Sequence, residues 1–326
     1  MRVLILGSRH PWRMEVAVQH ALVRAGHQVE VFDDRRSARM VGHRLTQRRA
    51  LRAAKRFRPD FVFLSKCHRL ALETVAAIIA GVPNAMWFHD APYHTELHRP
   101  EIAHYAAVGR LSEVFFVTGF VEEWRAHGLP AAFLPSAGAL EITPVPADPA
   151  WRTDASFIGA GYDTSRAEFL MRLAKVHGVR VYGPGWEPWR DQLAWNGGEV
   201  AGDAFSRACT SAAFSLGILP KIAAGTTTYA SDRMWMVMLA GGLYLGPRTP
   251  GLDAFLLDEE HCVWYDDIDD CIARMGRLLP DIERRAAIRA SGEAFVRAHH
   301  TYDARVPFLL GRRGWENPLA ARKPGG

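Results

Sequence analysis

The sequence predicts an α/β protein with two Rossmann-like domains, because a strand–helix succession occurs twice along its 326 residues. The first succession starts with the short apolar strand Arg2–Leu6, and the second starts at Ala155. Apolar strands that alternate with helices are typical of a parallel, doubly wound sheet. No internal sequence repeat accompanies them, so we expect the duplication to be one of architecture only.

The stretch Ala132–Trp151 separates the two successions. Its four prolines, at positions 135, 144, 146 and 149, interrupt regular structure and predict a linker. The basic, Pro/Gly-rich C-terminus is expected to be frayed. The predicted division is an N-terminal domain over residues 1–140, a C-terminal domain over 152–310 and a flexible tail over 311–326.

Turn residues mark the ends of the expected elements. Gly26 and Gly81, for example, follow apolar helical patterns and predict where those helices end. The strands expected are 2–6, 28–32, 61–64, 85–88, 114–117, 155–158, 179–182, 213–216, 243–245 and 263–264. The helices expected are 14–25, a basic helix within 35–58, 71–80, 166–176, 204–211, 234–240, 251–256, 267–279 and 281–299.

The composition excludes several classes of protein. Hydrophobic residues make up 48% of the chain and charged residues 23%, which favours a globular protein over a disordered one. No apolar run reaches the roughly 18 residues of a membrane helix. The N-terminus also lacks the features of a signal peptide. The four cysteines show no C-x-x-C spacing and predict reduced, mostly buried thiols in a cytoplasmic protein.

Positive charge is concentrated in one segment of a chain whose net charge is +5. Residues 35–58 contain ten Lys or Arg and no acid. Arg44, Arg48 and Arg52 recur every four residues and therefore share a helix face. This face is either a solvated surface or a docking surface for a polyanion: nucleic acid, an anionic membrane or a phosphorylated acceptor.

In the first domain, two polar segments follow predicted strands, where ligands bind in such folds. Ser8 and Arg9 follow the first strand in a turn that has no complete G-x-G-x-x-G pattern. That turn either is purely structural or faces a ligand. Trp87, His89, Asp90 and His94 form the second segment, and a His beside an Asp can orient or accept a proton. The alternative is a turn in which Asp90 caps a helix.

In the second domain, two glycine-rich turns could approach a phosphate. Gly159, Gly161 and Arg166 combine small residues with a cation, although an ordinary strand–helix turn would look the same. Gly183 and Trp186 belong to a Gly-Pro-Gly-Trp turn. Either this turn offers an aromatic face or amides to a base, or Trp186 packs in the core.

The sharpest signal is Ser231-Asp232-Arg233, because Arg233 begins an otherwise apolar helix. A buried Arg needs an anionic partner, either a diphosphate or an acid such as Asp232. Thr249, Pro250, Gly251 and Leu252 form a later loop whose amides could face the same anion. Lys221 is a further cation that could neutralise it.

These segments together resemble the spore-maturation (CgeB-like) branch of the group-1 glycosyltransferases. The resemblance covers roughly residues 1–310 and is most specific in the C-terminal half. The segments that carry it are Trp87–Asp90, Phe157–Gly159, Tyr182–Trp186, Ser231–Arg233, Ala240–Gly242, Thr249–Leu252 and His300–Tyr302 with Arg305.

The resemblance implies a GT-B fold, in which two Rossmann-like domains face each other across a cleft that holds the active site. It implies a UDP- or GDP-linked sugar donor held by the C-terminal domain and an acceptor on the N-terminal domain. It also implies catalysis without a bound metal, usually with retention, and a hexosyl- or pentosyltransferase. Arg233 would hold the donor diphosphate, and Asp90 or His89 would orient or deprotonate the acceptor hydroxyl.

Met236 departs from the family pattern, which has Glu at this position to bind the donor ribose. A thioether cannot accept two strong hydrogen bonds. This departure supports an alternative, a non-catalytic protein that binds a nucleotide sugar or nucleic acid. A nicotinamide-dependent oxidoreductase is disfavoured by the missing fingerprint. The acceptor stays open between a small molecule, an envelope glycan and a modified base in nucleic acid.

Overall fold

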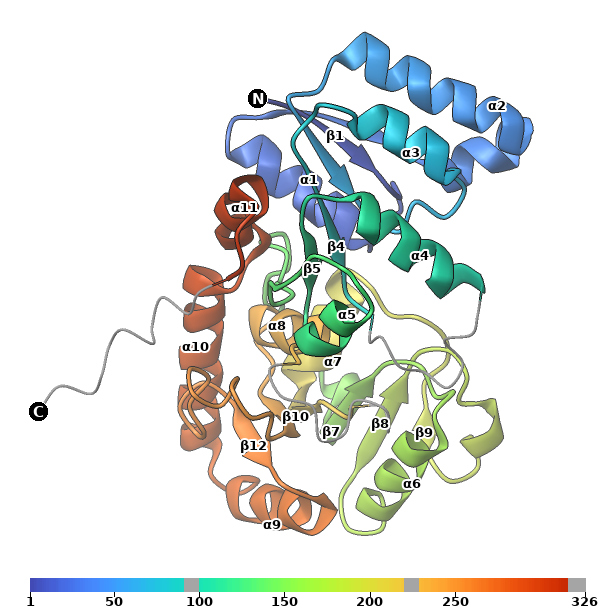
Figure 1. Cartoon of the computed structure of the whole chain (residues 1–326). Helices are drawn as coiled ribbons and strands as arrows, with labels where there is room; N and C mark the ends of the chain where they lie inside the picture. Colours follow the sequence, from blue (N-terminus) through green and yellow to red (C-terminus); the bar gives the residue numbers. More distant parts are fainter. Residues whose placement is uncertain (91–99, 220–228, 316–326) are drawn as a thin grey trace, which may run out of the picture. The chain divides into compact units, whose positions relative to one another are not determined.

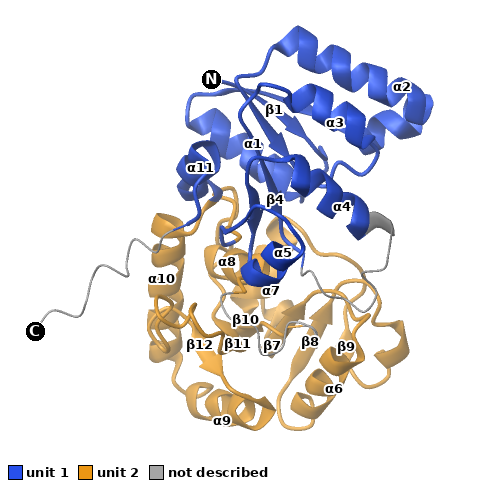
Figure 2. Ribbon diagram, viewed as in Figure 1, with its two compact units in different colours: residues 1–135, 302–317 blue, residues 136–301, 318–326 orange. Residues whose placement is uncertain are grey.

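The computed structural model describes residues 1–90, 100–219 and 229–315, without the side chains of residues 100 and 101. The chain divides into two compact units (Figure 2). Of the described residues, unit 1 comprises 1–90, 100–135 and 302–315, and unit 2 comprises 136–219 and 229–301. Each unit contains one parallel sheet of six strands (Figure 1), so the expected fold class is confirmed.

The sheet of unit 1 has the strand order β2-β1-β3-β4-β5-β6. Its strands are β1 (Arg2–Leu6), β2 (Gln28–Phe32), β3 (Phe61–Leu64), β4 (Asn84–Phe88), β5 (Phe115–Val117) and β6 (Ala131–Phe133). Its helices are α1 (Met14–Arg24), α2 (Asp34–Phe57), α3 (Leu72–Ile79), α4 (Pro100–Leu111), α5 (Val121–Ala126) and α11 (Tyr302–Gly311). The order reverses direction between β1 and β3, which makes this pair the switch point of the sheet.

Alternation along the strands divides the core of unit 1 between the two faces of its sheet. Leu4, Val62 and Phe88 are buried on one face, in a cluster with side chains of α2, α3 and α4. Their strand neighbours are buried on the other face, where α11 contacts both α1 and β4. Both faces are therefore covered, as expected for a parallel sheet.

The sheet of unit 2 has the order β12-β11-β10-β7-β8-β9, with its switch point between β7 and β10. Its strands are β7 (Thr153–Ile158), β8 (Val179–Tyr182), β9 (Ala194–Trp195), β10 (Ala212–Leu216), β11 (Tyr244–Pro247) and β12 (Val263–Tyr265). Its α-helices are α6 (Thr164–Leu173), α7 (Asp203–Ser211), α8 (Asp232–Leu239), α9 (Ile268–Leu278) and α10 (Ile282–His299), with short 3-10 turns at Pro149–Trp151 and Glu187–Trp189.

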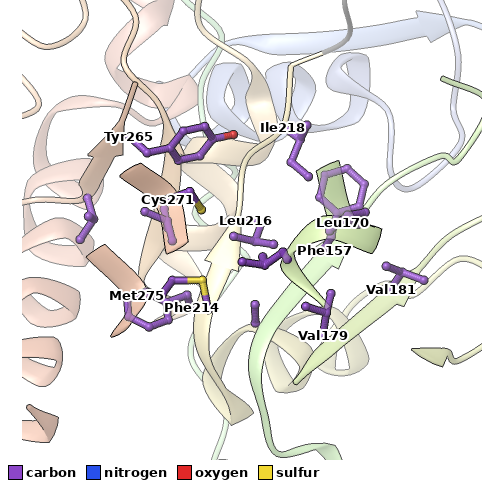
Figure 3. Packing of buried hydrophobic residues seen from close by; sticks show 14 of the residues in the cluster. Phe157, Leu170, Val179, Val181, Phe214, Leu216, Ile218, Tyr265, Cys271 and Met275 are labelled. Carbon is purple, nitrogen blue, oxygen red and sulfur yellow. The ribbon is translucent and has the colours of Figure 1, made fainter. Parts of the chain in front are cut away.

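A buried cluster joins this sheet to α6 and α9 (Figure 3). Phe157 of β7 and Phe214 of β10 lie in it with Leu170 of α6 and Met275 of α9, and each of these side chains is fully buried. The cluster fixes β7 and β10 beside each other, and therefore fixes the loops that follow them.

Several predicted elements differ in the structure. Residues 251–256 form turns rather than a helix, because Gly251 has a left-handed φ of +90°. Helix α10 matches the helix expected over 281–299 and packs on α8 inside unit 2, whereas α11 belongs to unit 1. The segment expected to be a flexible tail, residues 311–326, is ordered at its start, because Trp315 N donates a hydrogen bond to Phe133 O at 2.7 Å. Strands β6 and β9 and helices α4, α5 and α11 were not predicted.

The predicted burial of the cysteines is confirmed, because all four are buried and none forms a disulfide bond. None of the helices in the described segments is sufficiently long and apolar to span a membrane.

Candidate functional site

The candidate site in unit 2 lies at the switch point of its sheet, where the loops that follow β7 and β10 diverge. In doubly wound sheets this position forms the ligand crevice. Arg166 links the two loops, because its Nε donates to Ile218 O at 3.2 Å and its Nη1 to Ala160 O at 3.3 Å. The switch point therefore carries a positive charge that is held by both loops.

Arg233, the second residue of α8, reaches the same place. Its guanidinium lies over the ring of Phe157, 4.7 Å from the centroid, and Arg166 lies over that ring at 5.9 Å. Gly159 makes room for the guanidinium, since a β-carbon there would lie 2.3 Å from Arg233 Nη2. Arg233, Arg166 and Gly159 were predicted site residues, whereas Phe157 was named only as part of the family resemblance, because no polar pattern marks it.

The two guanidinium groups raise each other's electrostatic free energy. Burial, and next the like charge of Arg233, lower the pKa of Arg166 to about 10. Burial also lowers the pKa of Arg233. Among the described residues, no carboxylate lies within ion-pair distance of either group. Asp232 accepts a hydrogen bond from the backbone N–H of Arg233 at 2.9 Å, not from its side chain. An anion bound here would offset the repulsion.

The two glycine turns, Gly159–Gly161 and Gly183–Trp186, pack against each other next to the site. Trp186 is fully buried, and its indole N–H donates to Gly159 O at 2.8 Å. A β-carbon at Gly161 would lie 2.5 Å from Trp186, and one at Gly183 would lie 2.5 Å from Gly159 O. Trp186 therefore has no face free for a base, contrary to the first of its two interpretations, and it packs in the core.

Three glycine amides of these turns already donate to carbonyl groups of the chain. Gly159 N donates to Tyr182 O and Gly161 N to Pro184 O, each at 2.9 Å. Gly183 N donates to Gly198 O at 3.0 Å. The turns consequently shape the site, while its positive charge comes from the arginine side chains.

The loop from Thr249 to Leu252 is similarly closed on itself. Thr249 and Leu252 are buried, and Pro250 and Gly251 are exposed. Gly251 N donates to Asp253 at 3.1 Å, and Leu252 N donates to Thr249 O at 3.0 Å. These two amides are therefore used within the loop.

Helix α8 presents one half-buried stripe, formed by Arg233 and Met236, while most of its other side chains are buried. Ser231 precedes the helix as its half-buried N-cap residue. Because residues three apart lie on the same side of a helix, Met236 lies beside Arg233. Tyr244 and Tyr229 also lie close enough to Arg233 to affect its pKa, and the sequence analysis missed both.

In unit 1, the predicted segment at the end of β4 contains one buried, one half-buried and one exposed described residue. Trp87 is buried and its indole N–H donates to Leu134 O at 3.2 Å, so it supports the fold rather than contacting an acceptor. His89 is half-buried with its ring 4.9 Å from that of Trp87. Asp90 is exposed and forms an ion pair with Lys66.

The segment after β1 is accessible. Ser8 N donates to the buried Glu15 at 3.3 Å, and the hydroxyl of Ser8 accepts from His10 N at 3.0 Å. Arg9 is exposed, but its guanidinium turns away to Val31 O at the edge of β2. Arg44, Arg48 and Arg52 are exposed on α2.

The loop after β3 adds residues that the sequence analysis missed. His68 Nδ1 accepts from Tyr105 Oη at 2.6 Å and from Arg35 Nη2 at 3.0 Å. Burial, and next the charges of Arg35 and Lys66, lower the pKa of His68 to about 3. Because β1 and β3 form the switch point of unit 1, the polar residues that follow Leu64 could have been found from their position alone.

Two predicted site residues, His94 and Lys221, lie outside the described residues. In the described ranges, no cluster of three or more His, Cys, Asp or Glu could hold a metal ion.

Comparison with known proteins supports a glycosyltransferase fold. Residues 166–311 match a family model described as glycosyl transferase-like. No curated protein matches the sequence significantly. The finer resemblance to the CgeB-like branch remains a prediction.

Solved structures match almost the whole chain. HepE of Anabaena, in complex with UDP, shares 10% identity, with a TM-score of 0.62 over 96% of this chain and 100% of its own. An alpha-glucosyltransferase in complex with UDP and a 13-mer DNA shares 13%, with a TM-score of 0.65 over 96% and 98%. BGT of phage T4, in complex with UDP-glucose, shares 13%, with a TM-score of 0.57 over 96% and 98%. The chain therefore has a GT-B type of fold.

Proposed function

We propose that this protein is a glycosyltransferase that takes a sugar from a nucleotide-sugar donor held in unit 2 and transfers it to a hydroxyl acceptor. One observation carries the proposal: Arg233 and Arg166 converge on Phe157 at the switch point with no carboxylate partner among the described residues. A diphosphate fits that arrangement, because two negatively charged groups can accept from both guanidiniums.

The arginines would act on the leaving group. As the bond between the anomeric carbon and the phosphate oxygen breaks, negative charge grows on the diphosphate. Donors already aimed at that charge stabilise the transition state more than the ground state. Such stabilisation does not need a metal, so we propose a metal-independent reaction. The family resemblance favours retention of configuration, and a hexosyl or pentosyl group.

The nucleotide is proposed to be a uridine or guanosine diphosphate. HepE, the alpha-glucosyltransferase and BGT are each described in complex with UDP or UDP-glucose, which supports uridine. Met236 occupies the place of the carboxylate that would bind the ribose, so the ribose must find another partner. Asp232, exposed one residue before Arg233, is available for this.

The acceptor is proposed to bind unit 1, at the carboxyl ends of β1, β3 and β4. Asp90 or His89 would orient the acceptor hydroxyl or remove its proton. The ion pair with Lys66 holds the Asp90 side chain in place at the end of β4. A modified base in nucleic acid is one candidate acceptor, supported by the DNA in the alpha-glucosyltransferase complex and by the arginines of α2.

A panel of ligands tests the proposal against its two alternatives. Nucleoside diphosphates and their glucose conjugates should raise the melting temperature, since a ligand at 100 times its Kd adds about 2.7 kcal/mol of stability. Nicotinamide cofactors should not. An enzyme would then release free nucleoside diphosphate from its glucose conjugate when a cell extract supplies the acceptor, whereas a binding protein would not. Stabilisation by NAD alone would contradict the proposal.

A further inference from the structure

Helix α2 carries nine Lys or Arg residues and one acid, Asp34, which is buried at its start. The helix is kinked at Gly42, whose φ is +75°, so residues on either side of the kink belong to two helical segments. Its cations are exposed, and Arg56 pairs with Glu30 of the neighbouring strand β2 at 2.6 Å. A surface with this much unbalanced charge favours binding of an anion.

The structure adds a groove that the sequence could not show. It has a volume of about 560 Å³ and lies in unit 1 between α2 and β2, the edge strand of the sheet. Its walls carry five arginines: Arg9, Arg36, Arg49, Arg52 and Arg56. Of the three arginines singled out by their four-residue spacing, only Arg52 lines the groove.

The acids in the groove are already satisfied. Glu30 accepts from Arg56, and Asp33 accepts from the backbone N–H groups of Arg9 and Arg36 at 3.0 and 2.8 Å. No described carboxylate forms an ion pair with the side chains of Arg36, Arg49 or Arg52. The groove therefore holds at least three guanidiniums, those of Arg36, Arg49 and Arg52, that pair with no carboxylate of the described residues.

We propose that this groove binds the phosphodiester backbone of nucleic acid. Arg49, Arg52 and Arg56 follow one side of α2 and span about 10 Å at 1.5 Å per residue. Measured along the axis of a duplex, that length corresponds to about three 3.4 Å steps of one strand, so the three side chains can face successive phosphates. The planar guanidinium also donates to phosphate oxygens in pairs, which suits a repeated phosphate better than a single ion.

A membrane surface fits the helix less well. An interfacial helix needs a continuous apolar stripe. Leu45 and Leu51 are exposed on α2, but at 100° per residue they lie about 120° apart around the helix, with Arg48 between them. The arginines of α2 line a groove, whereas in an interfacial helix the cations would flank an apolar stripe.

The binding does not depend on sugar transfer, so it is measured without any donor. Fluorescence anisotropy of labelled single- and double-stranded oligonucleotides across a salt series should give a linear fall of log affinity with log salt. The variant R36Q/R49Q/R52Q removes three groove cations of α2 that pair with no described carboxylate. The matched control R44Q/R48Q/K55Q removes three cations from the outward side of the same helix.

The groove variant should bind at least tenfold more weakly, and its salt slope should be smaller by about 2 to 3, since each phosphate contact contributes about 0.7 to 0.9. The loss of binding free energy in the control variant should be less than a third of the loss in the groove variant. Equal losses in both variants, or no binding of either oligonucleotide at low salt, would overturn the proposal. So would binding to vesicles of anionic phospholipid with no binding to nucleic acid. Circular dichroism establishes that both variants are folded.

Discussion

The guanidinium of Arg233 lies 4.7 Å from the centre of the Phe157 ring. Phe157 is itself fully buried near the end of β7, so its ring is a fixed surface over which the cation lies. Cation–π attraction holds the group in place without neutralising its charge. The site thus keeps a positioned positive charge, which is what recognition of a diphosphate requires.

Gly159 should be needed for the position of Arg233 and not for folding. In Gly159→Ala the new methyl would lie 2.3 Å from Arg233 Nη2, the far end of a long side chain that can move aside. We expect less than about 1 kcal/mol of lost stability. Affinity for UDP should fall about tenfold or more, because a charged hydrogen bond contributes about 1.5–3 kcal/mol. Calorimetric titration and urea unfolding measure the two effects.

The control for this variant is Gly276→Ala. Gly276 lies within α9, and a β-carbon there meets nothing within 4 Å. Alanine should stabilise that helix by up to about 1 kcal/mol and leave UDP affinity unchanged. If Gly159→Ala also binds UDP normally, Arg233 does not contact the nucleotide.

Trp186 is expected to act on the site through Gly159. Trp186→Phe removes the indole N–H and leaves Gly159 O without its donor, at a cost of about 1–3 kcal/mol in unfolding free energy. Trp189→Phe changes a half-buried neighbour with no such bond and should cost less. Chemical unfolding of the two variants compares them directly. Equal costs would mean that the hydrogen bond contributes nothing.

Met236→Glu should fold and should strengthen binding of uridine nucleotides. Met236 is half-buried on the same stripe of α8 as Arg233, so a carboxylate there can reach a ribose and stay hydrated. Two added hydrogen bonds should tighten UDP binding by about tenfold. Met238→Glu is the contrast: Met238 is buried, and a carboxylate there costs several kcal/mol. An unfolded Met236→Glu protein, or unchanged UDP affinity, would place position 236 away from the ribose.

His68 should make the stability of the protein fall in mild acid. Its folded-state pKa is about 3, whereas the ordinary value is 6.5, so the unfolded chain takes up the proton first. The stability is therefore complete above pH 6.5 and is lost progressively as the pH falls toward 3. Protonation at Nδ1 would also break the bonds from Tyr105 and Arg35.

The unfolding free energy of His68→Gln should consequently depend less on pH between 6.5 and 5. Urea unfolding at several pH values measures the slope, with His43→Gln, an exposed change on α2, as the control. Parallel slopes for wild type and His68→Gln would contradict the expectation.

Local patterns predicted most of the fold. Strands β1, β2, β3 and β8 have the expected bounds, because short apolar runs between turn residues specify buried strands. The failures are tertiary. Residues 251–256 have a helical pattern, yet Gly251 turns the chain. Helix α11 belongs to unit 1, where it contacts α1 and β4 and where Arg305 Nε donates to Pro135 O at 3.0 Å; no local pattern predicts these contacts.

Local patterns also predicted part of the candidate site, and the part that depends on tertiary contacts was missed. A cation at the start of an apolar helix identified Arg233, and glycines after a strand identified Gly159. The partner of Arg233 could not be identified, because Phe157 looks like any core residue until β7 and α8 are placed in space. Trp186 was ambiguous because burial, not residue type, decides whether an aromatic ring is free to bind.

Calorimetric titration of UDP and UDP-glucose into the wild-type protein and Arg233→Ala tests the central claim most directly. The account predicts binding by the wild type and a loss of about 2–4 kcal/mol in the variant, roughly 30- to 700-fold, because a desolvated phosphate loses its charged partner. Arg172→Ala, which removes an exposed arginine of α6 paired with Asp269, should bind normally. A folded Arg233→Ala protein that binds UDP with wild-type affinity would contradict the account.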